Sequence, residues 1–429
     1  MEPLFLPIGR YGKLIYMSTD RFKSELLSLT YTVPLLAETA QMNAMVMALS
    51  RRGTVSFPTQ AAINRHLDEM YSTAISTSNR RVGDMQCISV TADFLGARYV
   101  GGGRGLLPEV VSLLRELIRA PRFDDKGQYL SAYVEGEKQV LTDAIRAAIN
   151  NPRGYALTHG QRLLCKGEPY ALSLIGEEDT VQGLTPADLA ARHKSLMGEV
   201  APVFCYVGAT PAAEVAALLT EAFGDLGGNA APYRADVHAH LGEVRRAEEE
   251  MPLSQGKLVL GFRTDIRADD PLAPALVLMN EIYGGSPASK LFMNVREKMS
   301  LCYHCSSAYH LYKGLLVANC GMKLANRTVA EEQMLAQFED IKRGNITKTE
   351  LEAAALALAN SYRSAYDSPA VLSRFYTARA VAGVPETVES WREKLARVTR
   401  NEIVEAAGRV DLGAVFFLKG TEDAEEDDE

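Results

Sequence analysis

The sequence predicts two α/β domains of similar organisation joined by a polar linker. The chain has 429 residues, more than a single hydrophobic core usually holds, so two domains are expected. Segment 224–236 is rich in glycine and polar residues, and both halves around it present the same order of elements. We therefore expect an N-terminal domain at 1–225, a linker at 226–245, a C-terminal domain at 246–421 and an acidic tail at 422–429.

The first half begins with apolar, β-branched runs and continues with helical segments. A helix over 37–49 is indicated by strong helix formers and by Gly53, which follows Arg52 as a stop signal. Segment 101–105 is glycine-rich but lacks the Lys-Ser/Thr of a phosphate loop, so we interpret it as a linker. The other predicted elements are strands at 13–16, 23–33, 72–78, 86–94 and 203–208, a helix at 60–70, and helices over 107–150, broken near 120–123, and onward to 194.

The second half repeats this order, which indicates an internal duplication. A strand is followed by two helices, a strand pair joined by a turn, long helices and a closing strand, as in the first half. The segments from Leu67 and from Val295 also resemble each other in pattern. The predicted strands are 257–264, 301–310, 315–323 and 413–419, and the predicted helices are 271–283, 289–298, 329–343 and 348–364.

Charge and composition exclude several classes of function. The net charge is −8 and the cations are scattered, whereas a nucleic-acid-binding face needs clustered Lys and Arg. No stretch approaches the roughly 20 apolar residues of a membrane helix, so we expect no membrane partner. Six cysteines in a long chain do not indicate a disulfide framework, and the N-terminus has no signal-peptide pattern. We therefore expect a cytoplasmic protein.

Four phrases are spread over nearly the whole chain: the passage ending at 50–54, the helix 135–146 followed by Asn151-Pro152, the segment 167–170 with Gly176 downstream, and 294–298 leading to 301–303. Together they resemble the pitrilysin/insulinase family of zinc metallopeptidases. Within that family the chain resembles the bacterial insulinase-like proteins associated with aminopentanol modification of an elongation factor. The resemblance implies an α+β fold of two homologous domains, each with a mixed, largely antiparallel sheet and helices packed on one face.

The zinc motif of that family is missing here. Active members carry H-x-x-E-H on the first helix, where two histidines one turn apart grip Zn²⁺ and the glutamate activates water. The matching positions are Ala44, Met47 and Ala48, and no histidine precedes His66. The distal zinc-binding glutamate would fall on Glu135, which we interpret as a solvated or relic residue, and its neighbours Glu137 and Lys138 as surface charges. We therefore expect this chain to bind no metal or other cofactor.

A second functional pair of the family is retained. The resemblance implies that Arg296 holds substrate backbone and that Tyr303 donates a hydrogen bond to the oxyanion forming on the scissile carbonyl. The alternative is structural: an Arg that caps carbonyls at a helix end and a Tyr that packs its ring on a strand. We favour the functional reading, because the zinc ligands are lost while this pair remains.

Other constellations are weaker. Cys302 and Cys305 form a C-x-x-C, but on a strand residues i and i+3 face opposite sides and could not share a metal. His238 and His240 lie in the linker region, where a chance surface pair is the simpler interpretation. His304 and His310 are most simply structural histidines.

Three functions remain open. The favoured hypothesis is a non-catalytic subunit of a heterodimeric zinc endopeptidase, in which a homologous partner bearing H-x-x-E-H supplies the zinc and this chain supplies Arg296 and Tyr303 in trans. A peptide substrate would add as a strand to a sheet edge near 72–78. The alternatives are a catalytically dead scaffold of the same fold, which the lost zinc ligands fit equally well, and an autonomous hydrolase with a new site.

Overall fold

The computed structural model describes residues 2–228, 232–239 and 242–421, so the predicted acidic tail at 422–429 and His240 lie outside the described residues. The chain divides into two compact units, and each combines a mixed sheet with helices. Unit 1 comprises Met1–Arg146, Leu172–Arg234 and Ala365–Thr387. Unit 2 comprises Ala147–Ala171, Ala235–Ser364 and Val388–Glu429. Within the described residues, no helix is both long and apolar enough to cross a membrane.

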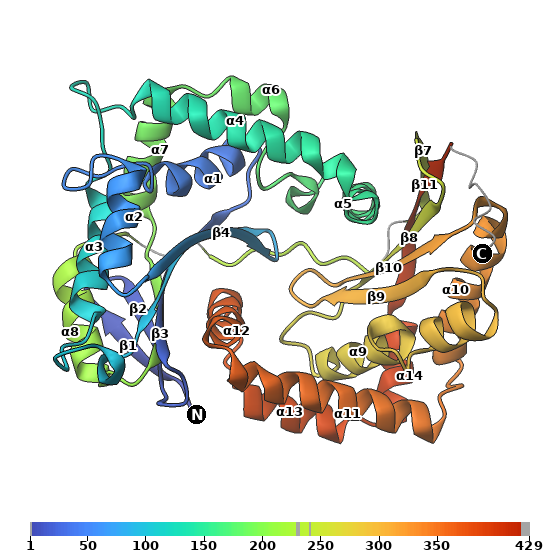
Figure 1. Ribbon diagram of the computed structural model, residues 1–429. Helices are drawn as coiled ribbons and strands as arrows, with labels where there is room; N and C mark the ends of the chain where they lie inside the picture. Colours follow the sequence, from blue (N-terminus) through green and yellow to red (C-terminus); the bar gives the residue numbers. More distant parts are fainter. Residues whose placement is uncertain (1, 229–231, 240–241, 422–429) are drawn as a thin grey trace, which may run out of the picture. The chain divides into compact units, whose positions relative to one another are not determined.

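Unit 1 contains a six-stranded sheet in the order β1-β2-β6-β3-β5-β4 (Figure 1). All neighbouring strands are antiparallel except β2 and β6, which are parallel. Its strands are β1 (Leu4–Ile8), β2 (Gly12–Ser18), β3 (Ser24–Pro34), β4 (Ala74–Val82), β5 (Met85–Leu95) and β6 (Val203–Gly208). Its helices are α1 (Ala40–Leu49), α2 (Gln60–Glu69), η1 (Ala97–Tyr99), α3 (Leu107–Arg119), α4 (Ser131–Ala147), α6 (Glu178–Gln182), α7 (Pro186–Glu199), α8 (Ala212–Phe223) and α12 (Pro369–Ala382).

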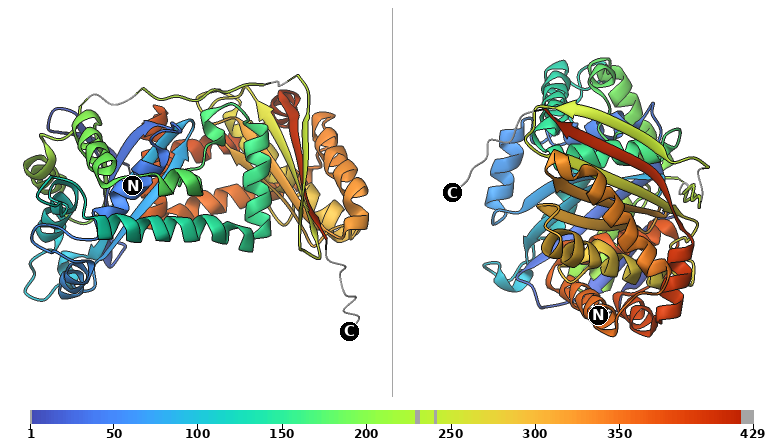
Figure 2. Two further views of the ribbon diagram at one scale, coloured as in Figure 1. Left: turned by 90° about the horizontal axis from the view of Figure 1, so that it is seen from above. Right: turned by 90° about the vertical axis from the view of Figure 1, so that its right-hand side faces the viewer.

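Unit 2 contains a five-stranded sheet in the order β7-β11-β8-β10-β9. The edge strand β7 is parallel to β11, and the right-hand view of Figure 2 shows the two side by side. Its strands are β7 (Arg245–Met251), β8 (Gly256–Thr264), β9 (His304–His310), β10 (Leu315–Met322) and β11 (Val410–Gly420). Its helices are η2 (Ala148–Asn150), α5 (Pro152–Leu164), η3 (Pro169–Ala171), α9 (Ala273–Asn280), η4 (Glu281–Gly285), η5 (Leu291–Lys298), η6 (Leu324–Asn326), α10 (Arg327–Lys342), α11 (Lys348–Ser364), α13 (Val388–Arg397) and α14 (Arg400–Gly408); η7 (Ala365–Asp367) belongs to unit 1.

The strand orders support the internal duplication. Five strands of unit 1, β2-β6-β3-β5-β4, match the five strands of unit 2 one for one, including the single parallel pair beside an otherwise antiparallel sheet. The α+β class expected from the sequence is confirmed. Strand β1 is an addition of unit 1 that pairs with β2.

Each sheet is also covered by one helix from the opposite half of the sequence. Helix α5 packs on β8 and β11 of unit 2, and α12 packs on β3 and β6 of unit 1. Side chains alternate along a strand, and β8 shows both faces: Val259 packs with α5, whereas Phe262 contacts the ring of Phe338 on α10. Two exchanged segments therefore separate the units from the predicted continuous domains, 1–225 and 246–421: Ala147–Ala171 belongs to unit 2, and Ala365–Thr387 belongs to unit 1. The sequence of a helix shows which of its faces is apolar, but it does not show which sheet that face covers.

Candidate functional site

Helix α1 holds the three positions of the lost zinc motif. Met47 is 2% exposed, and Ala44 and Ala48 are partly buried. None of these side chains offers a nitrogen, an oxygen or a thiolate sulfur that could bind zinc. Among the described residues, no group of three histidine, cysteine or carboxylate side chains lies close enough at α1 to hold a metal ion. The first helix therefore cannot perform zinc chemistry.

A buried polar network fixes this helix, and sequence reasoning missed it. Asn43 is fully buried; its amide donates to Gln86 Oε1 at 2.6 Å, and its oxygen accepts from Arg192 Nε at 2.7 Å. Gln86 in turn donates to the carbonyl of Ala40 at 2.9 Å. Buried polar groups are stable only when they are paired, so this network ties α1 to β5 and α7. The only sequence signal was an asparagine within an apolar helical run.

The structure places Glu135 on α4, with 64% of its side chain exposed. Its carboxylate pairs with Lys138 Nζ at 3.0 Å. The expectation that Glu137 and Lys138 are surface charges was wrong, since they are 8% and 7% exposed. Glu137 pairs with Arg52, just beyond α1, and Lys138 also donates to the carbonyl of Gln182 at 3.0 Å. Charge alone suggested a solvated face, whereas each group has a specific partner that permits burial.

Arg296 and Tyr303 line one pocket in unit 2. Its volume is about 410 Å³, and its wall also includes Ser300, Cys302 and Asn326. Arg296 lies in η5, a π-helical segment, and stacks its guanidinium on the ring of Phe292 at 4.5 Å. Ser300, with φ of 52°, then turns the chain out of the helix toward β9. Two residues seven apart in the sequence thereby face the same cavity.

The backbone beside Tyr303 is held while its side chain is free to meet a ligand. The Tyr303 amide donates to the carbonyl of Gly321 on β10 at 2.9 Å, and Asn326 donates to the carbonyl of Leu301 at 3.0 Å. The Tyr303 residue is 50% exposed, and within the described part of the chain its hydroxyl makes no hydrogen bond. A fixed backbone with an unoccupied phenol donor is suited to binding an oxyanion or carbonyl oxygen.

Strand β4, which contains most of the predicted peptide-binding edge 72–78, is an edge strand of the unit 1 sheet. Its later part is contacted by the loop after η3, since Asn79 donates to the carbonyl of Leu174 at 2.8 Å and Arg81 donates to that of Leu172. In unit 2 the equivalent edge strand is β9, which begins one residue after Tyr303. Each unit therefore presents an edge that could pair with an extended peptide.

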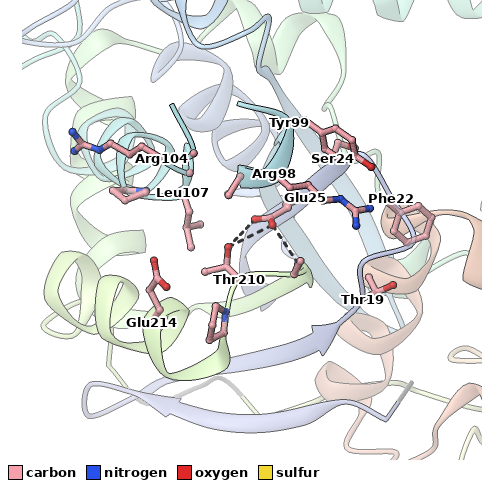
Figure 3. Close-up of a pocket in the computed structure, with 17 residues that line it drawn as sticks. Thr19, Phe22, Ser24, Glu25, Arg98, Tyr99, Arg104, Leu107, Thr210 and Glu214 are labelled. Atoms are coloured by element: carbon pink, nitrogen blue, oxygen red, sulfur yellow. Dashed lines mark hydrogen bonds between the residues drawn. The ribbon is translucent and has the colours of Figure 1, made fainter. Parts of the chain in front are cut away.

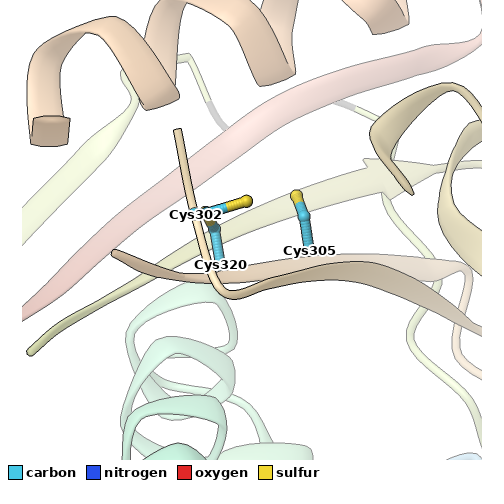
Figure 4. A group of neighbouring side chains, drawn as sticks. All are labelled: Cys302, Cys305 and Cys320. Carbon is cyan, nitrogen blue, oxygen red and sulfur yellow. The ribbon is translucent and has the colours of Figure 1, made fainter. Parts of the chain in front are cut away.

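The interpretation of the C-x-x-C was wrong in its geometry. Strand β9 begins at His304, so Cys302 lies before the strand. The alternation of side chains between the two faces of a strand therefore does not fix the direction of the Cys302 side chain. The sulfur atoms of Cys302, Cys305 and Cys320 all lie within 4.8 Å of one another (Figure 4). Hydrogen bonds from the thiols of Cys305 and Cys320 lower the pKa of Cys302. The charges of His304 and Arg296 lower this pKa further, whereas burial raises it by less than either hydrogen bond lowers it.

A further pocket of about 430 Å³ in unit 1 lies beside Glu25 (Figure 3). Glu25 is 4% exposed and accepts hydrogen bonds from the Tyr206 hydroxyl at 2.6 Å, the Ala209 amide at 3.2 Å and the Thr210 hydroxyl at 3.1 Å. Both carboxylate oxygens are used within the chain, so Glu25 is a structural brace between β3 and the end of β6.

Comparison with known proteins agrees with this architecture. Residues 183–358 match the family model described as the peptidase M16 inactive domain. The chain is similar to the peptidase M16 family over this segment. Helix α1 carries none of the residues of the zinc motif of active members of that family.

Three relatives illustrate the extent of the similarity. A probable inactive metalloprotease of Bacillus subtilis, YmfF, is 29% identical over 415 residues, which cover 95% of this chain and 96% of the relative. A conserved protein from Enterococcus faecalis is 26% identical, with a TM-score of 0.88 over 99% of this chain and 100% of that one. A peptidase M16 inactive domain from Pseudomonas fluorescens is 18% identical and shares the fold, with a TM-score of 0.81 over 99% of this chain and 100% of that chain.

Proposed function

We propose that this chain is the non-catalytic subunit of a heterodimeric zinc metalloendopeptidase. It binds the peptide substrate and supplies Arg296 and Tyr303 in trans to a homologous subunit that carries H-x-x-E-H. The observation that carries this proposal is the single pocket lined by both residues, beside the edge strand β9. The zinc itself comes from the partner, because Ala44, Met47 and Ala48 have no ligand atoms.

The roles of the two residues follow from their chemistry. A guanidinium on a half-buried Arg296 can bind peptide carbonyls, and its stacking on Phe292 limits its motion. The phenol of Tyr303 donates a hydrogen bond where negative charge develops on the attacked carbonyl oxygen. A preorganised donor of this kind contributes about 3 kcal/mol to transition-state stabilisation, which corresponds to a rate factor of about 10²–10³.

The peptide is held by main-chain hydrogen bonds along the first part of edge strand β4. Ala74 and Ser76 are exposed there, whereas Asn79 and Arg81 already contact the loop at 172–174. Strand addition recognises backbone and therefore accepts peptides of varied sequence. This makes β4 a binding edge for extended peptides and leaves sequence preference to side-chain pockets.

The test is peptidase activity of the chain alone and of the chain co-expressed with an H-x-x-E-H family member. We expect zinc-dependent cleavage only in the mixture. In that complex Tyr303→Phe should lower kcat by about 10²-fold or more with little change in KM, because the lost hydrogen bond forms in the transition state. Arg296→Ala should mainly raise KM, because it removes a contact made to the bound substrate.

Matched controls separate chemistry from assembly. Tyr99→Phe makes the same change at a tyrosine that is 40% exposed in unit 1, and Arg397→Ala removes an arginine whose side chain is 79% exposed. Both should leave activity unchanged, and size-exclusion chromatography should show intact complexes for all variants. Full activity in assembled Tyr303→Phe and Arg296→Ala complexes would favour the scaffold function. Zinc-dependent cleavage by the chain alone would reject the proposal.

A further inference from the structure

Three cysteines in unit 2 converge from two strands and the turn before them. Cys305 on β9 and Cys320 on β10 are direct cross-strand partners, so their side chains leave the sheet on the same face. Cys302 approaches from the turn that follows Ser300, and Figure 4 shows its thiol pointing toward that of Cys305. The turn is fastened on both sides of Cys302, through the Leu301 carbonyl and the Tyr303 amide.

The separation of the sulfur atoms suits coordination of one metal ion. Zinc–thiolate bonds are about 2.3 Å, so sulfurs that share one tetrahedral zinc lie about 3.8 Å apart. The three sulfurs are already within 4.8 Å of one another. Closing them onto a common ion requires each to move by less than about 1 Å, which small χ1 changes provide.

The burial of the three cysteines leaves one side of the cluster open. Cys305 and Cys320 are 4% and 0% exposed, whereas Cys302 is half-buried and lines the 410 Å³ pocket. Two ligands are therefore shielded from water, and the third opens toward a ligand-sized cavity. Three protein ligands with an open fourth position are typical of accessible zinc sites, whereas closed structural sites use four.

His304 is not a fourth ligand, although it adjoins Cys305 in the sequence. Alternation along β9 sends it to the opposite face, where it packs beside Gly321 and where Arg153 binds Ser306 at 3.0 Å. The fourth position is thus left to water or to a group in the pocket.

From this arrangement we infer that Cys302, Cys305 and Cys320 form a three-thiolate site for one Zn²⁺ ion, with its open coordination position facing the pocket of Arg296 and Tyr303. The site is separate from α1, and its ligands are different residues in the other unit. Because Tyr303 lies between two ligands in the sequence, bound zinc would also fix the backbone that carries the phenol. The inference stands on the cysteine geometry and is independent of the proposed peptidase function.

The first measurement uses the full chain, purified under reducing conditions, loaded with Zn²⁺ and desalted before metal analysis. We expect about one zinc per chain for the wild type. Cys302→Ser should lose most of it, and it should fold normally because Cys302 is half-buried and precedes β9. A Cys305→Ala/Cys320→Ala variant should lose it as well. Cys87→Ala, which changes a buried cysteine on β5 of unit 1, is the matched control and should retain zinc.

A second readout identifies the ligands directly. Co²⁺ bound in place of zinc should give a sulfur-to-cobalt charge-transfer band, and Cys302→Ser should reduce that band by about a third or more as one of three thiolates is lost. Bound zinc should also protect Cys302 from iodoacetamide in peptide mass spectrometry. Wild-type chain that retains no zinc and gives no cobalt–thiolate band would overturn the inference. Zinc content that is unchanged in both cysteine variants would overturn it equally, since the metal would then lie elsewhere.

Discussion

The ion cluster around Glu168 gives the sharpest stability prediction, through the substitution Glu168→Gln. Glu168 follows α5, and its carboxylate contacts Arg263 on β8 and lies 2.9 Å from Lys313 Nζ in the β9–β10 turn. The side chains of both cations are 1% exposed, so neither can regain water when the carboxylate is removed. Glu168 thus fastens the exchanged segment to the sheet of unit 2.

The expected magnitude follows from the two buried charges. Removal of one partner from a buried ion pair costs about 3–5 kcal/mol, because the other charge is left uncompensated. Arg263 keeps one acceptor, the Leu164 carbonyl at 2.7 Å, which offsets part of its share. We therefore expect Glu168→Gln to lower the free energy of unfolding of unit 2 by about 3–5 kcal/mol, and its melting temperature by about 10 °C.

The dependence on pH supplies an internal check. Burial raises the pKa of Glu168, but hydrogen bonds from Lys313 and Arg263 outweigh it and leave the pKa below its ordinary value. A carboxylate with a lowered folded-state pKa stabilises the protein above its unfolded-state pKa, and that stability is lost as pH falls through the folded-state value. The difference between wild type and Glu168→Gln should be full at pH 7 and should shrink below about pH 4.

Thermal and urea unfolding, followed by circular dichroism and tyrosine fluorescence, measure the effect. Glu393→Gln is the matched control, since Glu393 is 66% exposed and pairs with Arg397 on the surface at 3.4 Å. It should change stability by less than about 1 kcal/mol. A Glu168→Gln effect no larger than that of Glu393→Gln, or one that is undiminished at low pH, would refute the reasoning.

Two further substitutions test the packing of each unit. Gly160→Ala on α5 would place a Cβ 2.6 Å from Val259 Cγ1, so we expect a loss of about 1–3 kcal/mol in urea unfolding. At Gly198 on α7 the new Cβ would meet no described atom within 4 Å beyond its chain neighbours and the backbone of its own helix, so Gly198→Ala should be neutral or slightly stabilising. Asn43→Ala removes the donor to the buried Gln86 oxygen and one acceptor of the half-buried Arg192, and should cost about 1–3 kcal/mol. Asn360→Ala, at an exposed helical pair, should cost little, and equal effects of the two asparagine changes would contradict the buried network.

The order of the elements could be predicted from the sequence because apolar runs and helix signals are local. The predicted pair 301–310 and 315–323 corresponds to β9 and β10, and 271–283 to α9 and η4. Strand β7 was missed, since its sequence RRAEEEM is charged, as edge strands often are, and contains no alternation of apolar residues. Strand β1, with the sequence LFLPI, was missed because a five-residue run containing proline is a weak strand signal.

The candidate site was predictable only in part. The spacing of Arg296 and Tyr303 suggested a pair, and both line one pocket, although their catalytic role stays a prediction. The cysteine cluster could not be predicted, because Cys320 comes from a different strand and the exact start of β9 decides where Cys302 points. Strand starts depend on tertiary contacts, here the Tyr303 amide bonded to Gly321, and not on local preference alone.

The exchanged helices have a consequence for synthesis of the chain on the ribosome. The strands of the unit 1 sheet are complete in sequence by Gly208. Helix α12, whose Ser373 bonds Ser28 of β3 across 345 positions at 3.0 Å, is synthesised only after the whole segment 209–368. Until then one face of this sheet lacks its cover, and a nascent N-terminal half is an open template for aggregation or for chaperone binding. For the same reason, a gene divided in the linker would yield an N-terminal fragment that carries α5 of unit 2 and a C-terminal fragment that carries α12 of unit 1. The two fragments should regain stability only when they are mixed.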